Sequence, residues 1–221
     1  MNKTKTILKP LFYRRKPRRS LSLLQKNLLK FNLKNFLFDK KKIKKKKKFL
    51  EIGFGYGENI INLAKKNPKK VIIGCEVYEP GITNLLKNIE KENLKNILIF
   101  PKNIFILLNK LEQNSIEKIF ILYPDPWPKK KHYKRRLITK VFVNKISQIL
   151  KKKGIIHIFT DSEDYLKKIL AELLSKKKFL WMDKKIEKCN KRPNELIKSK
   201  YEKKADIKGN KKYYLKFKKI C

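Results

Sequence analysis

Cysteine is scarce in this sequence, and its three copies are scattered. Cys75, Cys189 and Cys221 are odd in number and far apart along the chain, so they provide neither a disulfide framework nor the close spacing of a metal site. We therefore expect no bound metal, and we expect the protein to work in a reducing compartment, the cytoplasm.

Long apolar runs and acidic residues are also rare. No uncharged apolar stretch approaches the roughly 20 residues that a membrane span needs, and no signal-peptide core precedes Pro10. We therefore expect no membrane partner. The 60 Lys and Arg outnumber the 19 Asp and Glu, which gives a formal net charge of +41 and favours nucleic acid as the partner. Drift toward AT-rich codons would also enrich lysine, so the size of the charge does not measure affinity.

From Phe49 onward, short apolar runs alternate with helical patterns. We expect strands at 49–52, 71–76, 96–100, 119–123, 155–159, 179–181 and 213–217, and helices at 58–66, 80–93, 104–111, 134–150 and 162–175. This alternation predicts an α/β fold with a mostly parallel, doubly wound sheet. We expect one domain over residues 45–221. Residues 1–44 would form a basic arm with a flexible start (1–18), a helix from Ser20 to about Phe31, and a solvated lysine-rich linker (40–48).

The stretch IFILYPDPWPKKKHYKRR (119–136) carries the most information. Its three prolines fix φ and remove backbone donors, so Asp125 and Trp127 would lie on a stiff loop at a strand's carboxyl end, where ligands bind in open α/β sheets. A carboxylate held beside a dense basic run suggests chemistry on a polyanion, whereas a solvated proline-rich loop is the alternative. Trp127 could equally stack a flipped base or plug the loop. His132 is expected to contact phosphate or base, and His157 to lie in the core.

Three predicted strands end at, or are followed by, residues that suit a nucleoside-bearing cofactor. After the first strand, the glycines have the spacing G-x-G-x-G, which lets a ligand approach the backbone closely. This spacing differs from the G-x-G-x-x-G of dinucleotide sites. Glu51 suits a cation, Glu76 suits two ribose hydroxyls, and Asn103 could accept an adenine amino group. A carboxylate-lined site without a phosphate cradle favours S-adenosylmethionine over NAD, with a generic nucleotide fold as the alternative. The full set is Glu51, Gly53, Gly55, Gly57, Glu76 and Asn103.

Five segments resemble the bacterial tRNA (guanine-N7-)-methyltransferases. They are LEIGFGYGENI (50–60), GCEVYEPGI (74–82), YPDPWPKKKHYKRRL (123–137), FTDSEDY (159–165) and RPNELIKSKYEKKADIKG (192–209). The proline-tryptophan-basic block and the late S-K-Y-E block are specific, because generic methyltransferases share only the glycine loop and the acid after the second strand. The resemblance implies a Rossmann-like class I methyltransferase fold with an antiparallel late strand. It also implies S-adenosylmethionine as cofactor, tRNA as partner, and methylation of N7 of the guanine at position 46 in the variable loop.

The resemblance further implies a role for each matching residue. Glu51 and the glycines would hold the methionine end of the cofactor, Glu76 its ribose, and Asn103, where the family usually has Asp, its adenine. Asp125 would be the catalytic residue, lying between cofactor and guanine. The implied substrate contacts are Lys129, Asp161, Ser199 (commonly Thr in the family), Lys200, Tyr201 and Glu202. The implied RNA contacts are Lys131, His132, Tyr133, Lys134, Arg135 and Arg136.

Other functions remain open at this point. The chain could be an RNA-binding protein with a vestigial methyltransferase core, or a methyltransferase that acts on another RNA or on a protein. Its oligomeric state, monomer or homodimer, is not fixed by the sequence.

Overall fold

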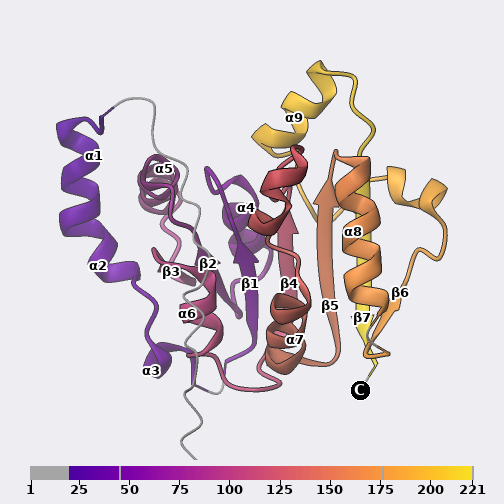
Figure 1. Cartoon of the computed structure of the whole chain (residues 1–221). Coiled ribbons are helices and arrows are strands. Elements are labelled where there is room, and N and C mark those ends of the chain that lie inside the picture. The colour runs from indigo at the N-terminus through magenta and orange to yellow at the C-terminus, as the bar shows by residue number, and fades with distance from the viewer. Residues whose placement is uncertain (1–19, 45, 176, 221) are drawn as a thin grey trace, which may run out of the picture.

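A seven-stranded sheet lies at the centre of the computed structural model, which describes residues 20–44, 46–175 and 177–220 (Figure 1). The strand order is β3-β2-β1-β4-β5-β7-β6. Strands β1 to β5 pair in parallel, and β7 runs antiparallel between β5 and β6. The predicted sheet, including its antiparallel late strand, is confirmed. The strands are β1 (Lys48–Ile52), β2 (Val71–Cys75), β3 (Ile97–Phe100), β4 (Ile116–Leu122), β5 (Leu150–Thr160), β6 (Phe179–Trp181) and β7 (Tyr213–Lys219).

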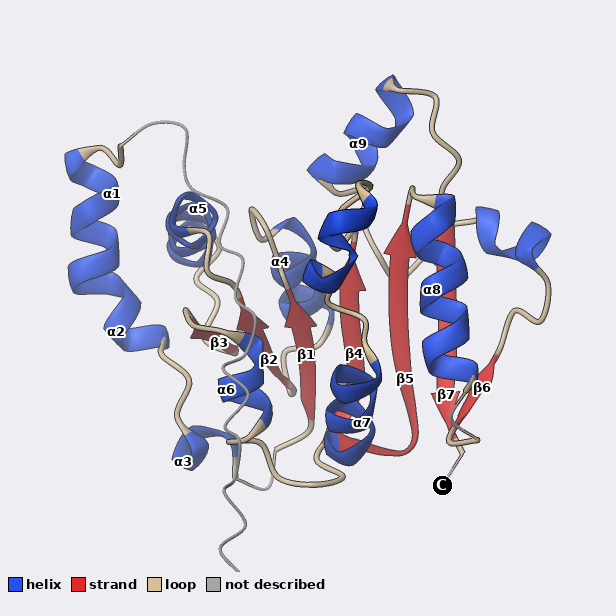
Figure 2. Cartoon of the chain, viewed as in Figure 1, coloured by secondary structure: helices blue, strands red, loops and turns tan. Residues whose placement is uncertain are grey.

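Helices cover both faces of the sheet (Figure 2). Helices α6, α7 and α8 pack on one face, and α4 and α5 pack on the other. The α-helices are α1 (Leu23–Asn27), α2 (Leu33–Phe36), α3 (Lys40–Ile43), α4 (Glu58–Lys66), α5 (Glu79–Lys91), α6 (Ile104–Leu108), α7 (Lys140–Ile149), α8 (Glu163–Leu174) and α9 (Lys200–Ile207). A π-helical segment (Leu28–Asn32) joins α1 to α2, and 3-10 helices cover Lys130–Arg135 and Ile186–Asn190. In the described part of the chain, every helix is too short or too polar to cross a bilayer.

The central strands are buried on both faces, which is why they appear in the sequence as continuous apolar runs. In β1, Leu50 packs in the cluster under α6, α7 and α8, and the adjacent Phe49 packs in the cluster under α4 and α5. His157 is fully buried in β5, where its ring stacks on Phe120 of β4 with centroids 5.0 Å apart. The expectation that His157 lies in the core is confirmed.

The helix expected at 134–150 is wrong at its start. Residues Lys130–Arg135 form a 3-10 helix, and α7 begins only at Lys140. The Thr139 side chain accepts a hydrogen bond from the Phe142 backbone N–H at 3.3 Å, which is the N-cap that sets this start. Helix α9 was not predicted, although Ser199 is its N-cap and accepts from the backbone N–H of Glu202 at 3.2 Å.

The N-terminal segment packs on the sheet to a greater extent than expected. The predicted helix is present as α1, the π-helical segment and α2, but its cap is Ser22, in a capping box with Gln25. Leu28 is buried against the α4/α5 cluster. The lysine-rich linker predicted for residues 40–48 is exposed at the described lysines up to Lys47, but it is wrong at two points: Ile43 is buried in α3, and Lys48 is buried at the start of β1. The flexible arm predicted for residues 1–18 lies outside the described residues.

Candidate active site

The predicted site residues gather at the edge of the sheet formed by the carboxyl ends of the parallel strands. Glu51 is the next-to-last residue of β1. Glu76 follows β2, Asp125 follows β4 and Asp161 follows β5. Figure 1 shows α9 beyond the arrowheads of β4 and β5, at this same edge. The S-K-Y-E block on α9 therefore lies over the ends of the strands that carry the acidic residues.

The turn between β1 and α4 is a left-handed glycine loop, residues 53–57. Gly53, Gly55 and Gly57 have φ of +73°, +57° and +87°, a region that glycine adopts without a steric penalty. The loop is also approached closely by α5, because a Cβ at Gly81 would lie 2.0 Å from the Gly55 carbonyl oxygen. Sequence reasoning did not single out Gly81, although a glycine in the first turn of a helix is itself an indication of close packing.

Glu76 holds the glycine loop in place. Its Oε2 accepts from the Gly55 N–H at 2.9 Å, and its Oε1 accepts from the N–H groups of Val77 and Tyr78 at 2.7 and 3.0 Å. Burial raises the pKa of Glu76, and the three N–H donors partly offset this rise. A carboxylate offers about four lone-pair sites, so one site remains, and Glu76 can accept one ribose hydroxyl in good geometry instead of the two expected.

Glu51 is a buried carboxylate beside the glycine loop. It is 2% exposed, and its Oε2 accepts from Asn59 Nδ2 at 3.0 Å. Burial is the main cause that raises its pKa to about 8. Among the described residues, no basic side chain forms an ion pair with Glu51. A buried carboxylate with this environment suits the cationic end of a ligand, so the residues present fit S-adenosylmethionine, whose amino and sulfonium groups are positive.

Asn103 is the N-cap of α6. Its Oδ1 accepts from the Phe105 backbone N–H at 2.8 Å, so one lone pair of the oxygen that we assigned to adenine already serves the helix. The side chain is half-buried. The second lone pair and the amide N–H groups are what Asn103 can offer to a ligand.

Asp125 lies on a strained loop, residues 123–128, which we call the proline loop. Tyr123 and Trp127, on either side of it, have φ of +54° and +43°, values that non-glycine residues rarely adopt. The Tyr123 N–H donates to the Phe159 carbonyl at 2.9 Å, which ties the start of the loop to β5. Asp125 itself is exposed. Its charge is close enough to add to the burial effect on the pKa of Glu76.

Arg136 holds the other side of the proline loop. Its Nε donates to the Pro126 carbonyl at 2.7 Å, its guanidinium pairs with Asp164, and its Cζ lies 3.7 Å from the centroid of the Tyr133 ring. Only 3% of its side chain is exposed. The pairing lowers the pKa of Asp164. Arg136 was predicted to contact RNA, but these contacts give its guanidinium a position inside the protein.

The rest of the basic run has a mixed exposure. Lys129, Lys131 and Lys134 are exposed, and Tyr133 is partly exposed. Arg135 lies with its Cζ 4.9 Å from the Trp127 ring centroid, and the His132 ring packs edge-on to the same ring. Trp127 is half-buried in this group, so stacking a base and plugging the loop both remain compatible with its position.

The late block contacts the glycine loop through α9. A Cβ at Gly55 would lie 2.9 Å from Tyr201 Cε2, and Lys200 Nζ lies 4.1 Å from the centroid of the Tyr56 ring. Glu202 is 3% exposed, and its Oε1 accepts from Arg192 at 3.0 Å and from the Tyr214 hydroxyl at 2.7 Å.

The structure therefore brings Lys200 and Tyr201 to the glycine loop. It gives Ser199 and Glu202 contacts within the protein: Ser199 caps the helix, and Glu202 joins it to Arg192 and β7. Asp161, at the end of β5, accepts from Asn210 at 2.9 Å. Sequence reasoning missed Asn59, Gly81 and Arg192, because only the folded chain brings them against the predicted residues.

A family model and two curated relatives that match this chain are all described as methyltransferases. A family model described as "Putative methyltransferase" matches residues 45–215. The tRNA (guanine-N(7)-)-methyltransferase of Buchnera aphidicola subsp. Acyrthosiphon pisum (strain 5A) is 37% identical over 169 residues, which are 76% of this chain and 70% of that protein. The bifunctional methyltransferase of Rickettsia conorii is 40% identical over 155 residues, which are 69% of this chain but 30% of that protein. Across these and six further curated relatives, the chain spans 30 to 72% of their length.

The fold has solved counterparts at low sequence identity. The crystal structure of an rRNA methylase from Streptococcus thermophilus superposes with a TM-score of 0.54 at 13% identity. The match covers 86% of this chain and 92% of that one. At this identity the likeness concerns the fold alone, and it agrees with the predicted class I methyltransferase architecture.

Proposed function

Because the chain belongs to the tRNA (guanine-N7-)-methyltransferase family, we propose that it transfers a methyl group from S-adenosylmethionine to N7 of a guanine in tRNA. The target is the guanine at position 46 in the variable loop. The observation that carries the proposal is the packing of Tyr201 against Gly55. It joins the late block, which generic methyltransferases lack, directly to the cofactor turn.

The proposed reaction depends on how the two reactants are positioned and needs no proton transfer. The cofactor supplies an activated methyl group on a sulfonium. Guanine N7 has a lone pair and no proton, so no side chain needs to act as a base. The rate depends on holding N7 in line with the methyl group, which rigid loops favour. Glu51 and Glu76 hold the cofactor at the glycine loop, and Asp125 faces the substrate from the proline loop.

Asp125 orients the guanine. Its carboxylate accepts hydrogen bonds from the N1–H and N2–H₂ groups on the edge of the base, and its charge offsets the positive charge that develops on the purine. The strained backbone at Tyr123 and Trp127, with the Arg136 bond to Pro126, keeps the carboxylate in one place. Such local order matters because small misplacements at the reacting centre cost rate steeply.

RNA is held by the exposed part of the basic run. Lys129, Lys131 and Lys134 are exposed beside the proline loop, and the chain as a whole has a formal net charge of +41. Phosphate contacts of this kind position the RNA without reading its sequence. We place the catalytic domain at residues 45–221 and the protein in the cytoplasm, as a monomer or a homodimer.

Product identification is the direct test. Purified protein is incubated with labelled S-adenosylmethionine and unmodified tRNA, and the nucleosides are then separated and identified by mass spectrometry. We expect 7-methylguanosine, which maps to the variable loop. A methyl group on another nucleoside or on a protein would instead indicate a methyltransferase of different specificity. RNA binding without cofactor binding, measured by calorimetry, would indicate a vestigial core.

A further inference from the structure

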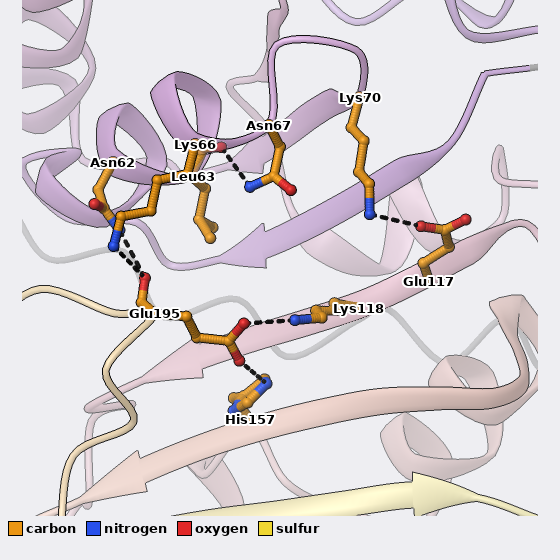
Figure 3. A network of polar contacts seen from close by, with 9 residues as sticks. All are labelled: Asn62, Leu63, Lys66, Asn67, Lys70, Glu117, Lys118, His157 and Glu195. Atoms are coloured by element: carbon orange, nitrogen blue, oxygen red, sulfur yellow. Dashed lines mark hydrogen bonds and ion pairs between the residues drawn. The ribbon is translucent and has the colours of Figure 1, made fainter.

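The segment that precedes α9 lies on one face of the sheet, and one of its residues contacts three elements. Glu195 lies on the α4/α5 face of the sheet, between α4 and the strands β4 and β5 (Figure 3). Its backbone carbonyl accepts from Asn62 Nδ2 at 3.0 Å and from Lys66 Nζ at 3.3 Å, both on α4. Its carboxylate accepts from Lys118 Nζ of β4 at 2.6 Å and lies 3.3 Å from His157 Nε2 of β5.

The ionic partner of Glu195 is Lys118. Burial is the main cause that lowers the pKa of His157 to about 4, so the imidazole is neutral at pH 7. Burial opposes ionisation of Glu195, but the hydrogen bond and the charge of Lys118, with smaller contributions from His157 and Lys216, together lower its pKa. Both side chains are partly buried, at 39% and 28% exposure, so this pair is screened less by solvent than a surface pair.

This attachment lies just before the residues that reach the cofactor loop. The adjacent Leu196 is buried in the α4/α5 cluster. Ser199 then caps α9, and Tyr201 packs against Gly55. Helix α4, which holds the Glu195 carbonyl, itself starts at the glycine loop with Gly57 as its cap. Glu195 is therefore fixed to the helix that begins directly after the glycine loop and to the strand that leads to Asp125.

We propose that Glu195 is a positioning residue, which fixes the distance and the orientation of α9 relative to the glycine loop. The proposal rests on the proposed function and adds a residue that touches neither cofactor nor guanine. The Arg192–Glu202–Tyr214 contacts hold α9 at its far side, and Glu195 holds it at the sheet. These two attachments together hold Tyr201 and Lys200 in a single position against the glycine loop.

The test compares Glu195→Ala and Glu195→Gln with Glu117→Gln. Glu117 of β4 also pairs with lysines, with Lys70 just before β2 at 3.2 Å and with Lys151 of β5 at 3.4 Å, but neither pairing involves the segment before α9. Limited trypsin digestion reports local opening, because α9 and its approach contain Lys198 and Lys200 among several lysines. Steady-state kinetics on tRNA and the Kd for S-adenosylmethionine report function.

For Glu195→Ala we expect faster cleavage in residues 191–208, by about tenfold, because a local attachment is lost without global unfolding. We expect kcat/KM for tRNA to fall by about tenfold, while the cofactor Kd changes by less than about threefold. Glu195→Gln keeps an acceptor for Lys118 and should recover most of both losses. Glu117→Gln should match the parent. Adding Lys118→Met to Glu195→Ala should cost no more than either change alone, since the two residues act as one unit.

Two outcomes would overturn the proposal. Parent-like cleavage and kinetics in Glu195→Ala would show that α9 keeps its place without the Glu195 carboxylate, which is the part of the residue that this variant removes. Equal losses in the melting temperature, the cofactor affinity and the tRNA kinetics would show general destabilisation instead of positioning. If the parent enzyme does not methylate tRNA, the proposed function fails. The trypsin and cofactor measurements would still decide the role of Glu195.

Discussion

The glycine loop follows β1 and the proline loop follows the neighbouring strand β4, at the same edge of the sheet, yet different interactions fix them. The glycine loop takes left-handed φ values at three glycines, where they cost little, and a half-buried carboxylate, Glu76, accepts the Gly55 backbone N–H. The proline loop takes left-handed φ values at Tyr123 and Trp127, where they are unfavourable for residues other than glycine. A buried guanidinium, Arg136, donates to its backbone carbonyl.

The difference follows from what each loop presents. The glycine loop offers backbone to a ligand that approaches closely, so side chains there would obstruct it. The proline loop offers one side chain, Asp125, whose direction matters. Strain that the surroundings hold in place is found where geometry is part of function. In the proposed function, the glycine loop on the cofactor side thus allows close approach, and the proline loop on the substrate side holds one orientation.

The strongest test of the proline loop removes the charge that it presents. In Asp125→Asn we expect single-turnover methylation to slow by about 10²–10³, as for other preorganised electrostatic contacts. Asn also faces the donors of guanine with donors of its own. The loss should be independent of pH from about 6 to 9, because guanine N7 carries no proton that a base would have to remove. A parent rate that rises through a defined pKa, absent in the variant, would instead make Asp125 a general base.

The matching test of the glycine loop is Glu76→Ala. It removes an acceptor for one ribose hydroxyl and the tie to the Gly55 N–H. Loss of hydrogen bonds to a charged group suggests a cofactor affinity weaker by about 1.5–3 kcal/mol, measurable by calorimetry. Circular dichroism should stay near that of the parent, because the sheet does not depend on this residue. Unchanged cofactor affinity would refute the assignment of Glu76 to the ribose.

Arg136→Lys loosens the proline loop without touching the reactants. Lysine keeps a charge for Asp164 but cannot keep both the bond to the Pro126 carbonyl and the stacking on Tyr133. Loss of one such hydrogen bond suggests a fall in kcat of up to about tenfold, with cofactor affinity unchanged. If the salt dependence of tRNA binding changed and kcat did not, Arg136 would be an RNA contact after all.

Glu51 makes the glycine side of the site sensitive to pH. Its pKa is about 8 in the folded protein without ligand, and a cationic cofactor favours its charged form, so binding releases a proton. Cofactor affinity should therefore rise by about fivefold from pH 7 to pH 8 and level off above. The same linkage makes the free protein less stable as pH rises from about 4.5 to 8. Calorimetry on the parent and on Glu51→Gln tests this, and the variant should lose the pH dependence of binding.

The smallest expected change extends the comparison to the end of β3. Asn103→Asp introduces the residue that the family usually has, and an aspartate caps α6 as well as asparagine does. Cofactor affinity should improve by only about two- to threefold, because an acceptor already exists and the new charge is partly desolvated. Weaker binding would mean that the pocket has adapted to the amide.

The sequence predicted the elements up to β3 well and those after Pro128 less well. Strands β1 to β3 and helices α4 and α5 have clear apolar periodicity and glycine or proline boundaries. The region after Pro128 is dominated by lysine, which hides both the 3-10 helix at Lys130–Arg135 and the start of α7. Helix α9 has a weak apolar face, with Glu202 and Ala205 as its buried residues, so its motif was recognisable before its structure was.

The site was predictable where a residue's role depends on its neighbours in sequence. Asp125 and the glycines belong to such motifs. Arg136 was not predictable, because a basic residue at the end of a basic run looks like any other until the fold buries it against Pro126 and Asp164. Glu195, likewise, has no local signal, since its partners lie 129 and 133 residues away on α4 and 77 residues away on β4.

The strand order has a consequence for the order of events during protein synthesis. Strand β7 follows β6 in the chain but lies between β5 and β6 in the sheet, so β6 has no strand to pair with until β7 has left the ribosome. Until then β5 is an exposed edge, which is prone to pairing with other chains. Helix α9 lies between β6 and β7 in sequence, and its Glu202 needs the Tyr214 hydroxyl of β7. Nascent chains that already contain the glycine and proline loops therefore lack the β7 contact of α9 until the last strand has emerged.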